Sequence, residues 1–332
     1  YLYSSQELIS LKGDDMNILV SGSLAYDRIM DFPGKFSDHI LPDKIHMLNV
    51  CFMINDIMEN FGGTAGNIAY AIALLGESPA IIATAGRDIE PYRNWLTQRN
   101  ISTKHIKVIQ DELTAGAYIT TDQSDNQITA FNPGAMKFSS DFDFDSVARE
   151  KTLAIVAPGN LGDMVNFSTI YKKKGIDYIF DPGQSLPSWT KELLTEMIHG
   201  SKIFICNDYE LQLTQEKTSM TVEEILERTE TLIITKGEFG SVVMQKDNNK
   251  IRSSNIPVAK AQQVNDPTGA GDAYRAGLIK GLVASKKDIV HAAKMGAVCA
   301  AYCVEVYGPQ NFHFTPELFN KRFSSIFGEK AF

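Results

Sequence analysis

One stretch near the C-terminal end of the sequence combines small residues, a carboxylate and the signals of a helix start. It reads Asn265-Asp266-Pro267-Thr268-Gly269-Ala270-Gly271-Asp272. The Asp-Pro-Thr part stops the preceding segment, and the alanine-rich residues after it favour a helix. Small residues at 269–271 let backbone N–H groups converge without obstruction. An anion bound there would meet free donors and the positive end of the helix dipole.

This arrangement suits phosphoryl transfer, because charge gathers on the migrating group and must be met by donors already in position. The carboxylate of Asp272 would lie beside the phosphate path, where it can take the proton of a substrate hydroxyl as that oxygen attacks. The alternative is an ordinary helix start in which Asp272 only complements the dipole. An isolated GxGD favours that alternative, so other motifs must support the catalytic interpretation.

Two other glycine-loop chemistries are excluded. The GxxxxGK[ST] phosphate loop is absent, since Gly34-Lys35 is followed by Phe36. A dinucleotide-binding fingerprint would need glycine at position 274, where the chain has Tyr274, and normally follows the first strand. A nicotinamide-dependent oxidoreductase is therefore disfavoured.

Polar residues follow the ends of several predicted strands, where α/β sheets bind ligands. Asp27 comes just after the first strand and can accept two hydrogen bonds from vicinal hydroxyls, as a ribose would offer. It can equally be a turn or cap residue. The segment Gly62-Gly63-Thr64-Ala65-Gly66-Asn67 precedes an amphipathic helix, so a ligand can approach its backbone closely while Asn67 donates and accepts. Helix packing and N-capping are the alternative there.

Two later motifs have the same placement. Asn207 and Glu210 follow the strand Ile203 to Cys206, and their oxygens suit Mg²⁺ directly or through its retained waters. They can also form a capping box, and both roles can coexist. Thr235-Lys236-Gly237-Glu238-Phe239-Gly240 makes a tight turn that can hold nucleotide phosphate or ribose, with a plain hairpin as the alternative.

The elements that must position these residues alternate along the chain. Strand-length apolar segments lie at Asn17 to Ser21, Ala80 to Ala83, Leu153 to Ala157, Tyr178 to Phe180, Ile203 to Cys206 and Leu232 to Thr235. Helical patterns lie at Asn67 to Leu75, Pro91 to Arg99, Met164 to Lys174, Lys191 to His199 and Val222 to Thr229, and Asp266 to Cys303 is nearly all helical in pattern. This alternation predicts an α/β fold with a mostly parallel sheet flanked by helices.

Two regions, about 27–60 and 114–132, break the alternation with extended patterns. They predict antiparallel strands that leave the main sheet and meet as one small sheet, which covers a site or pairs with another subunit as a homodimer. Met16 directly precedes the first strand and is the expected natural start. Residues 1–15 would then be a loose extension or a cloning remnant, and residues 16–332 the folded domain.

The formal net charge of -8 over 332 residues argues against a surface that binds nucleic acid or anionic lipid. No apolar run reaches the roughly 20 residues of a membrane span, and no secretory signal is evident, so a cytoplasmic location is expected. The cysteines form no CxxC pair, which supports neither structural zinc nor a disulfide framework. They are Cys51, Cys206, Cys299 and Cys303.

These motifs, in this order, resemble the ribokinase-like (PfkB) family of carbohydrate and nucleoside kinases. The resemblance runs from about Asn17 to the C-terminal helices and implies a Rossmann-like sheet with a small β lid. It implies that Gly269, Ala270 and Gly271 form the anion hole and that Asp272 is the catalytic base. It also implies that Asn207 and Glu210 organise Mg²⁺, through the water molecules bound to the ion. ATP would contact Asn207, Thr235, Gly237, Gly240 and Thr268, and a monovalent cation such as K⁺ is compatible with the family.

Within the family the chain is similar to bacterial adenosine kinases, through Gly22-Ser23-Leu24-Ala25-Tyr26-Asp27, Phe32-Pro33-Gly34-Lys35-Phe36, Asn132-Pro133-Gly134-Ala135-Met136 and the stretch 271–277. By this resemblance the substrate residues are Ser23, Asp27, Gly63, Asn67, Phe131 and Gln184, with Phe131 stacking on the purine. Two positions depart from the subgroup: Ala117 stands where a second aromatic can lie, and Ser185 replaces one of two adjacent glutamines.

The expected activity is ATP-dependent phosphorylation of the 5′-hydroxyl of a purine nucleoside, adenosine giving AMP. The open alternatives are a guanosine or inosine kinase, a sugar kinase on the same fold, and a nucleoside-binding protein without turnover.

Overall fold

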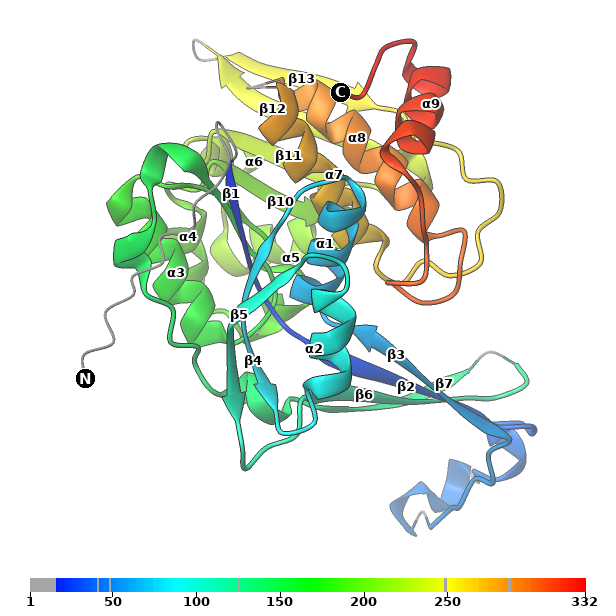
Figure 1. Ribbon diagram of the computed structural model, residues 1–332. Coiled ribbons are helices and arrows are strands. Elements are labelled where there is room, and N and C mark those ends of the chain that lie inside the picture. The colour runs from blue at the N-terminus through cyan, green and yellow to red at the C-terminus, as the bar shows by residue number, and fades with distance from the viewer. Residues whose placement is uncertain (1–15, 41, 48, 125, 248–249, 286–287) are drawn as a thin grey trace.

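A nine-stranded sheet forms the centre of the computed structural model, which describes residues 16–332 except 41, 48, 125, 248–249 and 286–287 (Figure 1). The strand order is β13-β12-β11-β10-β9-β8-β1-β4-β5. The strands are β1 (Asn17–Ser21), β4 (Ala80–Gly86), β5 (Ser102–Ile109), β8 (Thr152–Val156), β9 (Asp177–Phe180), β10 (Ile203–Asn207), β11 (Thr231–Thr235), β12 (Ser241–Asp247) and β13 (Lys250–Ile256). Strands β4 to β11 of this sheet pair in parallel with β1 or with one another, and β12 and β13 run antiparallel.

The α-helices cover both faces of this sheet (Figure 1). They are α1 (Thr64–Leu74), α2 (Glu90–Thr97), α3 (Leu161–Lys174), α4 (Lys191–Ile198), α5 (Asp208–Thr218), α6 (Val222–Leu226), α7 (Ala270–Ser285), α8 (Ile289–Cys303) and α9 (Pro316–Phe327). Successive residues of a strand point to opposite faces, so the buried strands feed two separate cores. In β1, Ile18 and Val20 join the core under α1, α7 and α8, whereas Leu19 joins the core under α3 and α4.

A second, four-stranded sheet projects from one edge of the main body (Figure 1). Its order is β3-β2-β6-β7, and its strands are β2 (Ala25–Asp31), β3 (Asp56–Gly62), β6 (Ala115–Thr121) and β7 (Gln127–Asn132). We call it the small sheet. Between β2 and β3 the chain makes two 3-10 turns, Phe36–Asp38 and Pro42–Met47.

The predicted α/β class is confirmed, and so is the meeting of the two irregular regions in one sheet. The expectation of antiparallel strands is wrong for one pairing, because β2 and β6 run parallel. Each of these strands follows a strand of the parallel main sheet and leaves it in the same direction. The edge strand β5 was not predicted, and neither was β13.

None of the helices in the described part of the chain combines the length and the apolar character needed to cross a membrane. The prediction that residues 1–15 are an extension lies outside the described residues.

Candidate active site

Asp272 lies in the first turn of α7, directly after the Gly269–Gly271 stretch in which the helix begins, as the sequence predicts. The loop needs glycine at 269, where φ is +78° and a Cβ would lie 2.5 Å from the Cβ of Pro309. Asp266 shapes the approach, because its Oδ1 accepts from the N–H of Thr268 (2.9 Å). The first N–H groups of a helix have no intrahelical acceptor. That of Ala270 donates to the carbonyl of Pro267, so the N–H groups of Gly271 and Asp272 are the donors that this helix start offers to a ligand.

A pocket of about 340 Å³ opens beside Asp272. The predicted residues that line it are Gln184, Asn207, Glu210, Thr235, Gly237, Gly269, Gly271 and Asp272, and they are joined by Thr64, Pro158, Asp181, Gly183 and Arg275. These residues lie at or shortly after the carboxyl ends of β8, β9, β10 and β11 and around the starts of α1 and α7. The topology thus brings together the motifs that the sequence left far apart.

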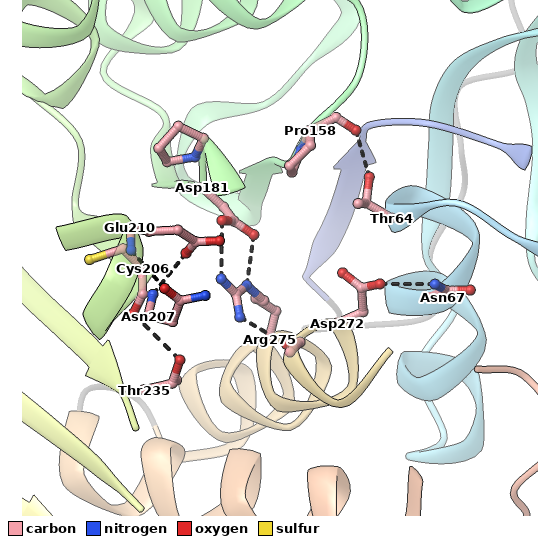
Figure 2. Close-up of polar contacts among 12 residues, drawn as sticks. Thr64, Asn67, Pro158, Asp181, Cys206, Asn207, Glu210, Thr235, Asp272 and Arg275 are labelled. Atoms are coloured by element: carbon pink, nitrogen blue, oxygen red, sulfur yellow. Dashed lines mark hydrogen bonds and ion pairs between the residues drawn. The ribbon is translucent and has the colours of Figure 1, made fainter. Parts of the chain in front are cut away.

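Asp272 accepts a hydrogen bond at Oδ2 from the Nδ2 of Asn67 on α1 (2.9 Å; Figure 2). Burial raises the pKa of Asp272 to about 7, against the lowering effect of the Asn67 hydrogen bond and the nearby Arg275. A carboxyl with a pKa near neutrality can both take and release a proton at physiological pH.

Arg275 and Asp181 form a buried ion pair at the wall of the pocket (Figure 2). Neither residue is among those that the sequence assigns to the site. The signal was available for Asp181, which comes directly after β9, much as Asn207 ends β10. Arg275 lies one helical turn after Asp272, so the two share a face of α7.

Asn207 and Glu210 form a capping box at the start of α5. The Oδ1 of Asn207 accepts from the N–H of Glu210 (2.7 Å), and one carboxylate oxygen of Glu210 accepts from the N–H of Asn207 (2.8 Å). Burial raises the pKa of Glu210, and the charge of Asp181 raises it further. The capping alternative is therefore present, and it leaves the Asn207 amide nitrogen and the second Glu210 oxygen for a ligand.

Thr235 and Gly237 lie where β11 turns into β12, and the hydroxyl of Thr235 approaches the carbonyl of Cys206 (3.5 Å). The turn is also the hairpin considered from sequence, since β11 and β12 pair antiparallel. Gly240 closes it: its carbonyl accepts from the N–H of Lys236 (2.8 Å), and a Cβ at 240 would lie 2.2 Å from the carbonyl oxygen of Ile256.

Other predicted residues do not line this pocket. Thr268 is exposed, and the N–H of Ala270 donates to the carbonyl of Pro267 (3.1 Å). Ser23 is buried, and its hydroxyl accepts from the N–H of Thr64 (3.0 Å). Gly63 has φ +86°, and a Cβ there would lie 2.6 Å from the carbonyl oxygen of Ser23.

Asp27, Ala117 and Phe131 form one cross-strand row on the small sheet, because Asp27 pairs with Ala117 and Ala117 with Phe131. Directly opposed residues point to the same face of a sheet. Phe131 is 53% exposed, and Ala117, which stands between it and Asp27 in the row, has only a methyl side chain. Burial raises the pKa of Asp27, as does the charge of Asp266.

The sequence profile described as pfkB family carbohydrate kinase matches residues 41–316. The chain is 33% identical over 271 residues to a nucleoside kinase from Methanocaldococcus jannaschii, covering 81% of this chain and 87% of that protein. The structure of Burkholderia thailandensis nucleoside kinase in complex with inosine is similar, with a TM-score of 0.80 and 36% identity over 94% of this chain and 99% of that chain. The same kinase has a structure in complex with ADP-inosine, at 37% identity and a TM-score of 0.78, over 94% of this chain and 97% of that one.

The family profile spans most of the chain, and the relatives align along most or nearly all of it. Both agree with a kinase site at the pocket beside Asp272. This protein belongs to the pfkB family of carbohydrate kinases and is a phosphotransferase that acts on a hydroxyl group.

Proposed function

We propose that the chain is an ATP-dependent nucleoside kinase that phosphorylates the 5′-hydroxyl of a purine nucleoside, with adenosine, giving AMP, as the first candidate. The observation that carries the proposal is the position of Asp272 in the first turn of α7, at the wall of the pocket and next to the Gly269–Gly271 loop. One helix start thus offers a base for the hydroxyl and donors for the migrating phosphoryl group.

In this mechanism Asp272 accepts the hydroxyl proton while the hydroxyl oxygen forms a bond to the γ-phosphorus and the bond from that phosphorus to ADP breaks. Asn67 holds the carboxylate through its Nδ2. The first-turn N–H groups of α7 and the loop before it meet the charge on the transferred group. Thr235 and Gly237, across the pocket, would contact the nucleotide.

The oxygen donors at the pocket fit a magnesium ion. Asp181 and Glu210 both line it. Asp181 is paired with Arg275, but one carboxylate oxygen of Glu210 takes no part in the capping box and can accept from water bound to the ion. Asn207 and Glu210 would hold Mg²⁺ through its waters, and the ion would neutralise charge on the nucleotide phosphates.

The nucleoside would lie between α1 and the small sheet. The row of Asp27, Ala117 and Phe131 offers a carboxylate for ribose hydroxyls and an exposed ring for stacking on a base. Inosine is the second candidate, because the Burkholderia kinase, 36% identical, is solved with inosine.

The small sheet would act as the lid that excludes water during transfer. Its edge strands carry exposed apolar side chains, Ile57 and Met58 on β3 and Ile128 and Phe131 on β7, which support pairing of two copies through the lids. Light scattering on the purified chain tests the dimer. Replacing potassium by choline in the assay tests the monovalent cation.

The deciding experiment is a panel of adenosine, inosine, guanosine, ribose and fructose 6-phosphate, assayed for ADP release and for the phosphorylated product. We expect a purine nucleoside to be turned over fastest and to yield its 5′-monophosphate. Preference for a free sugar would contradict the nucleoside assignment. Nucleoside binding with no ADP release would favour a binding protein.

A further inference from the structure

Asp272 is the end of a hydrogen-bond chain that begins on α2, a helix that contributes nothing to the pocket lining. The indole Nε1 of Trp95 donates to the Oε1 of Gln310 (3.1 Å). The Nε2 of Gln310 donates to the Oδ1 of Asn67 (3.0 Å), and the Nδ2 of Asn67 donates to the Oδ2 of Asp272 (2.9 Å). Gln310 and Asn67 lie 243 positions apart in the sequence.

The direction of this chain follows from chemistry. An indole nitrogen can only donate, so the atom of Gln310 that faces it must be the amide oxygen. The amide nitrogen of Gln310 then points at Asn67 and needs an acceptor, which fixes the oxygen of Asn67 toward Gln310. The nitrogen of Asn67 is thereby left facing Asp272. One donor-only group sets the orientation of two amides.

Both N–H groups of the Gln310 amide are used. Its Nε2 also donates to the Oη of Tyr92 (2.6 Å), and that hydroxyl donates to the carbonyl of Gly62 (2.9 Å). Gln310 is 2% exposed and Tyr92 is fully buried, so an unpaired group here would carry its whole desolvation cost. Neither amide can turn over without breaking several of these bonds.

The helix that carries Asn67 also makes room for this network. A Cβ at Gly66 would lie 1.8 Å from the Oη of Tyr92 and 3.0 Å from the Nε2 of Gln310. Glycine at 66 is therefore explained by the space that Tyr92 and Gln310 occupy, independently of any ligand.

We propose that Trp95 and Gln310 are positioning residues of the phosphoryl transfer, which act by holding the Asn67 amide with its N–H toward Asp272. The inference rests on the proposed function, because it takes Asp272 as the base. With the indole N–H removed, no donor-only group faces Gln310. If the Tyr92 hydroxyl then turns its proton from Gly62 to Gln310, both amides can flip, and the oxygen of Asn67 can face the carboxylate. Two acceptors then face each other unless Asp272 is protonated. The protonated form, which cannot act as a base, is therefore favoured.

Other ionisable groups face Asp272 from several elements. Arg275 on α7 favours its charged form, whereas Asp181 after β9 and Asp27 on β2 oppose it. Burial raises the pKa of Tyr92, and that of Cys303 on α8 to about 12, so both stay neutral. A substitution at Trp95 touches none of these charges. A change in the titration of Asp272 would therefore report the Asn67 contact.

The test measures the pH dependence of kcat/KM in matched variants. Trp95→Phe removes the indole N–H while keeping a ring against Phe61 and Tyr70. Gln310→Met removes the amide oxygen and the amide nitrogen and keeps a side chain of similar length. The control is Tyr70→Phe, which deletes a buried hydrogen bond to the carbonyl of Phe312 from the same aromatic stack and leaves the chain intact.

We expect the acid limb of the wild-type profile to move up by about one pH unit in Trp95→Phe and Gln310→Met, which is a loss of about tenfold at about pH 6. Activity should recover to within about twofold of wild type at about pH 9, where Asp272 is ionised in every variant. The acid limb of Tyr70→Phe should not move, and KM for ATP should be unchanged throughout.

Wild-type profiles in folded Trp95→Phe and Gln310→Met would overturn the inference. So would a shift of the same size in Tyr70→Phe, because the effect would then be structural. If Gln310→Met does not fold, Trp95→Phe decides alone. Failure of the proposed function would look different. Full turnover by Asp272→Asn would show that Asp272 is not the base. An inactive Asp272→Asn together with an unshifted profile in Trp95→Phe would refute only the positioning role.

Discussion

Arg275 donates two parallel hydrogen bonds to Asp181, from Nε to Oδ2 (2.6 Å) and from Nη2 to Oδ1 (3.1 Å). Its third nitrogen donates to the carbonyl of Gly271 (3.1 Å). The side chain therefore ties the end of β9 to the start of the helix that carries Asp272. Because both partners are less than a tenth exposed, neither charge can be satisfied by water alone.

Replacing Arg275 by methionine should destabilise the fold strongly. Asp181 would be left as a buried, unpaired carboxylate, a change that typically costs about 3–5 kcal/mol. Urea unfolding measures it. The double variant Arg275→Met with Asp181→Leu should recover much of the lost stability, and failure to recover any would contradict the assigned pairing. Arg275→Lys keeps the charge but loses the two-pronged geometry, so it should fall between wild type and Arg275→Met.

Asp272→Asn should retain nucleoside binding and lose turnover by about 10²- to 10⁴-fold, since an amide cannot accept the proton. Calorimetric binding and ADP release measure the two effects separately. Asp208→Asn is the matched control, because it neutralises an exposed carboxylate in the first turn of α5, close to the site. Comparable loss in both variants would point to net charge rather than to proton transfer.

The pH dependence of stability should reveal the same carboxyl. Its pKa is about 7 in the folded state against an ordinary 3.8, so the native state holds more protons between those values. Stability from this group therefore declines as pH rises through that window. Asp272→Asn removes the titration, and its thermal midpoint should exceed that of wild type at about pH 8 more than at about pH 4. An equal difference at both pH values would contradict the raised pKa.

Glu210→Gln should raise the Mg²⁺ concentration needed for half-maximal activity while leaving stability nearly unchanged. Glutamine can still accept from the N–H of Asn207 and complete the capping box, but it lacks the charge that attracts a cation. A magnesium titration of activity measures the change. The control is Glu224→Gln, which alters the equivalent capping box of α6 on the surface and should not change the magnesium requirement.

Gly63→Ala and Gly76→Ala separate backbone strain from close contact. Both glycines have φ near +85°, but a Cβ at 76 meets nothing within 4 Å, whereas one at 63 meets the carbonyl of Ser23 at 2.6 Å. Gly76→Ala should cost about 1–2 kcal/mol, the strain of a left-handed alanine. Gly63→Ala should cost more and should also reduce activity. Equal losses in chemical unfolding would mean that the contact is easily relieved.

The positions of the main site residues followed from one rule, that ligands bind beyond the carboxyl ends of parallel strands. The rule located Asp27, Asn207 and Thr235 because each follows a short apolar run. It also predicted the α/β class, since buried parallel strands leave continuous Ile and Val segments. Strand β5 (Ser102–Ile109) was not predicted because it is an edge strand with mixed burial and no apolar run.

Contacts between side chains that are far apart in the sequence could not be predicted from its hydrophobic pattern. Gln310 stands in an irregular segment after α8, and Trp95 reads as an ordinary residue of an amphipathic helix. Their bond joins positions 215 apart. Local propensity and periodicity describe neighbours in sequence, so a polar network that depends on how three segments pack can be found only in the folded structure.

Ser23, at the junction between the main sheet and the small sheet, is fixed by hydrogen bonds. Its N–H donates to the carbonyl of Pro158 (3.0 Å), its hydroxyl accepts from Thr64, and its carbonyl accepts from the N–H of Ala65 (3.0 Å). Both backbone groups of Ser23 are therefore bonded to the main body, and a hinge at this residue would break those bonds. If the small sheet moves as a lid, a movement that keeps these bonds has to bend the chain beyond residue 23. Asp27, the residue proposed to hold ribose, lies beyond that point, whereas Asp272 belongs to the main body.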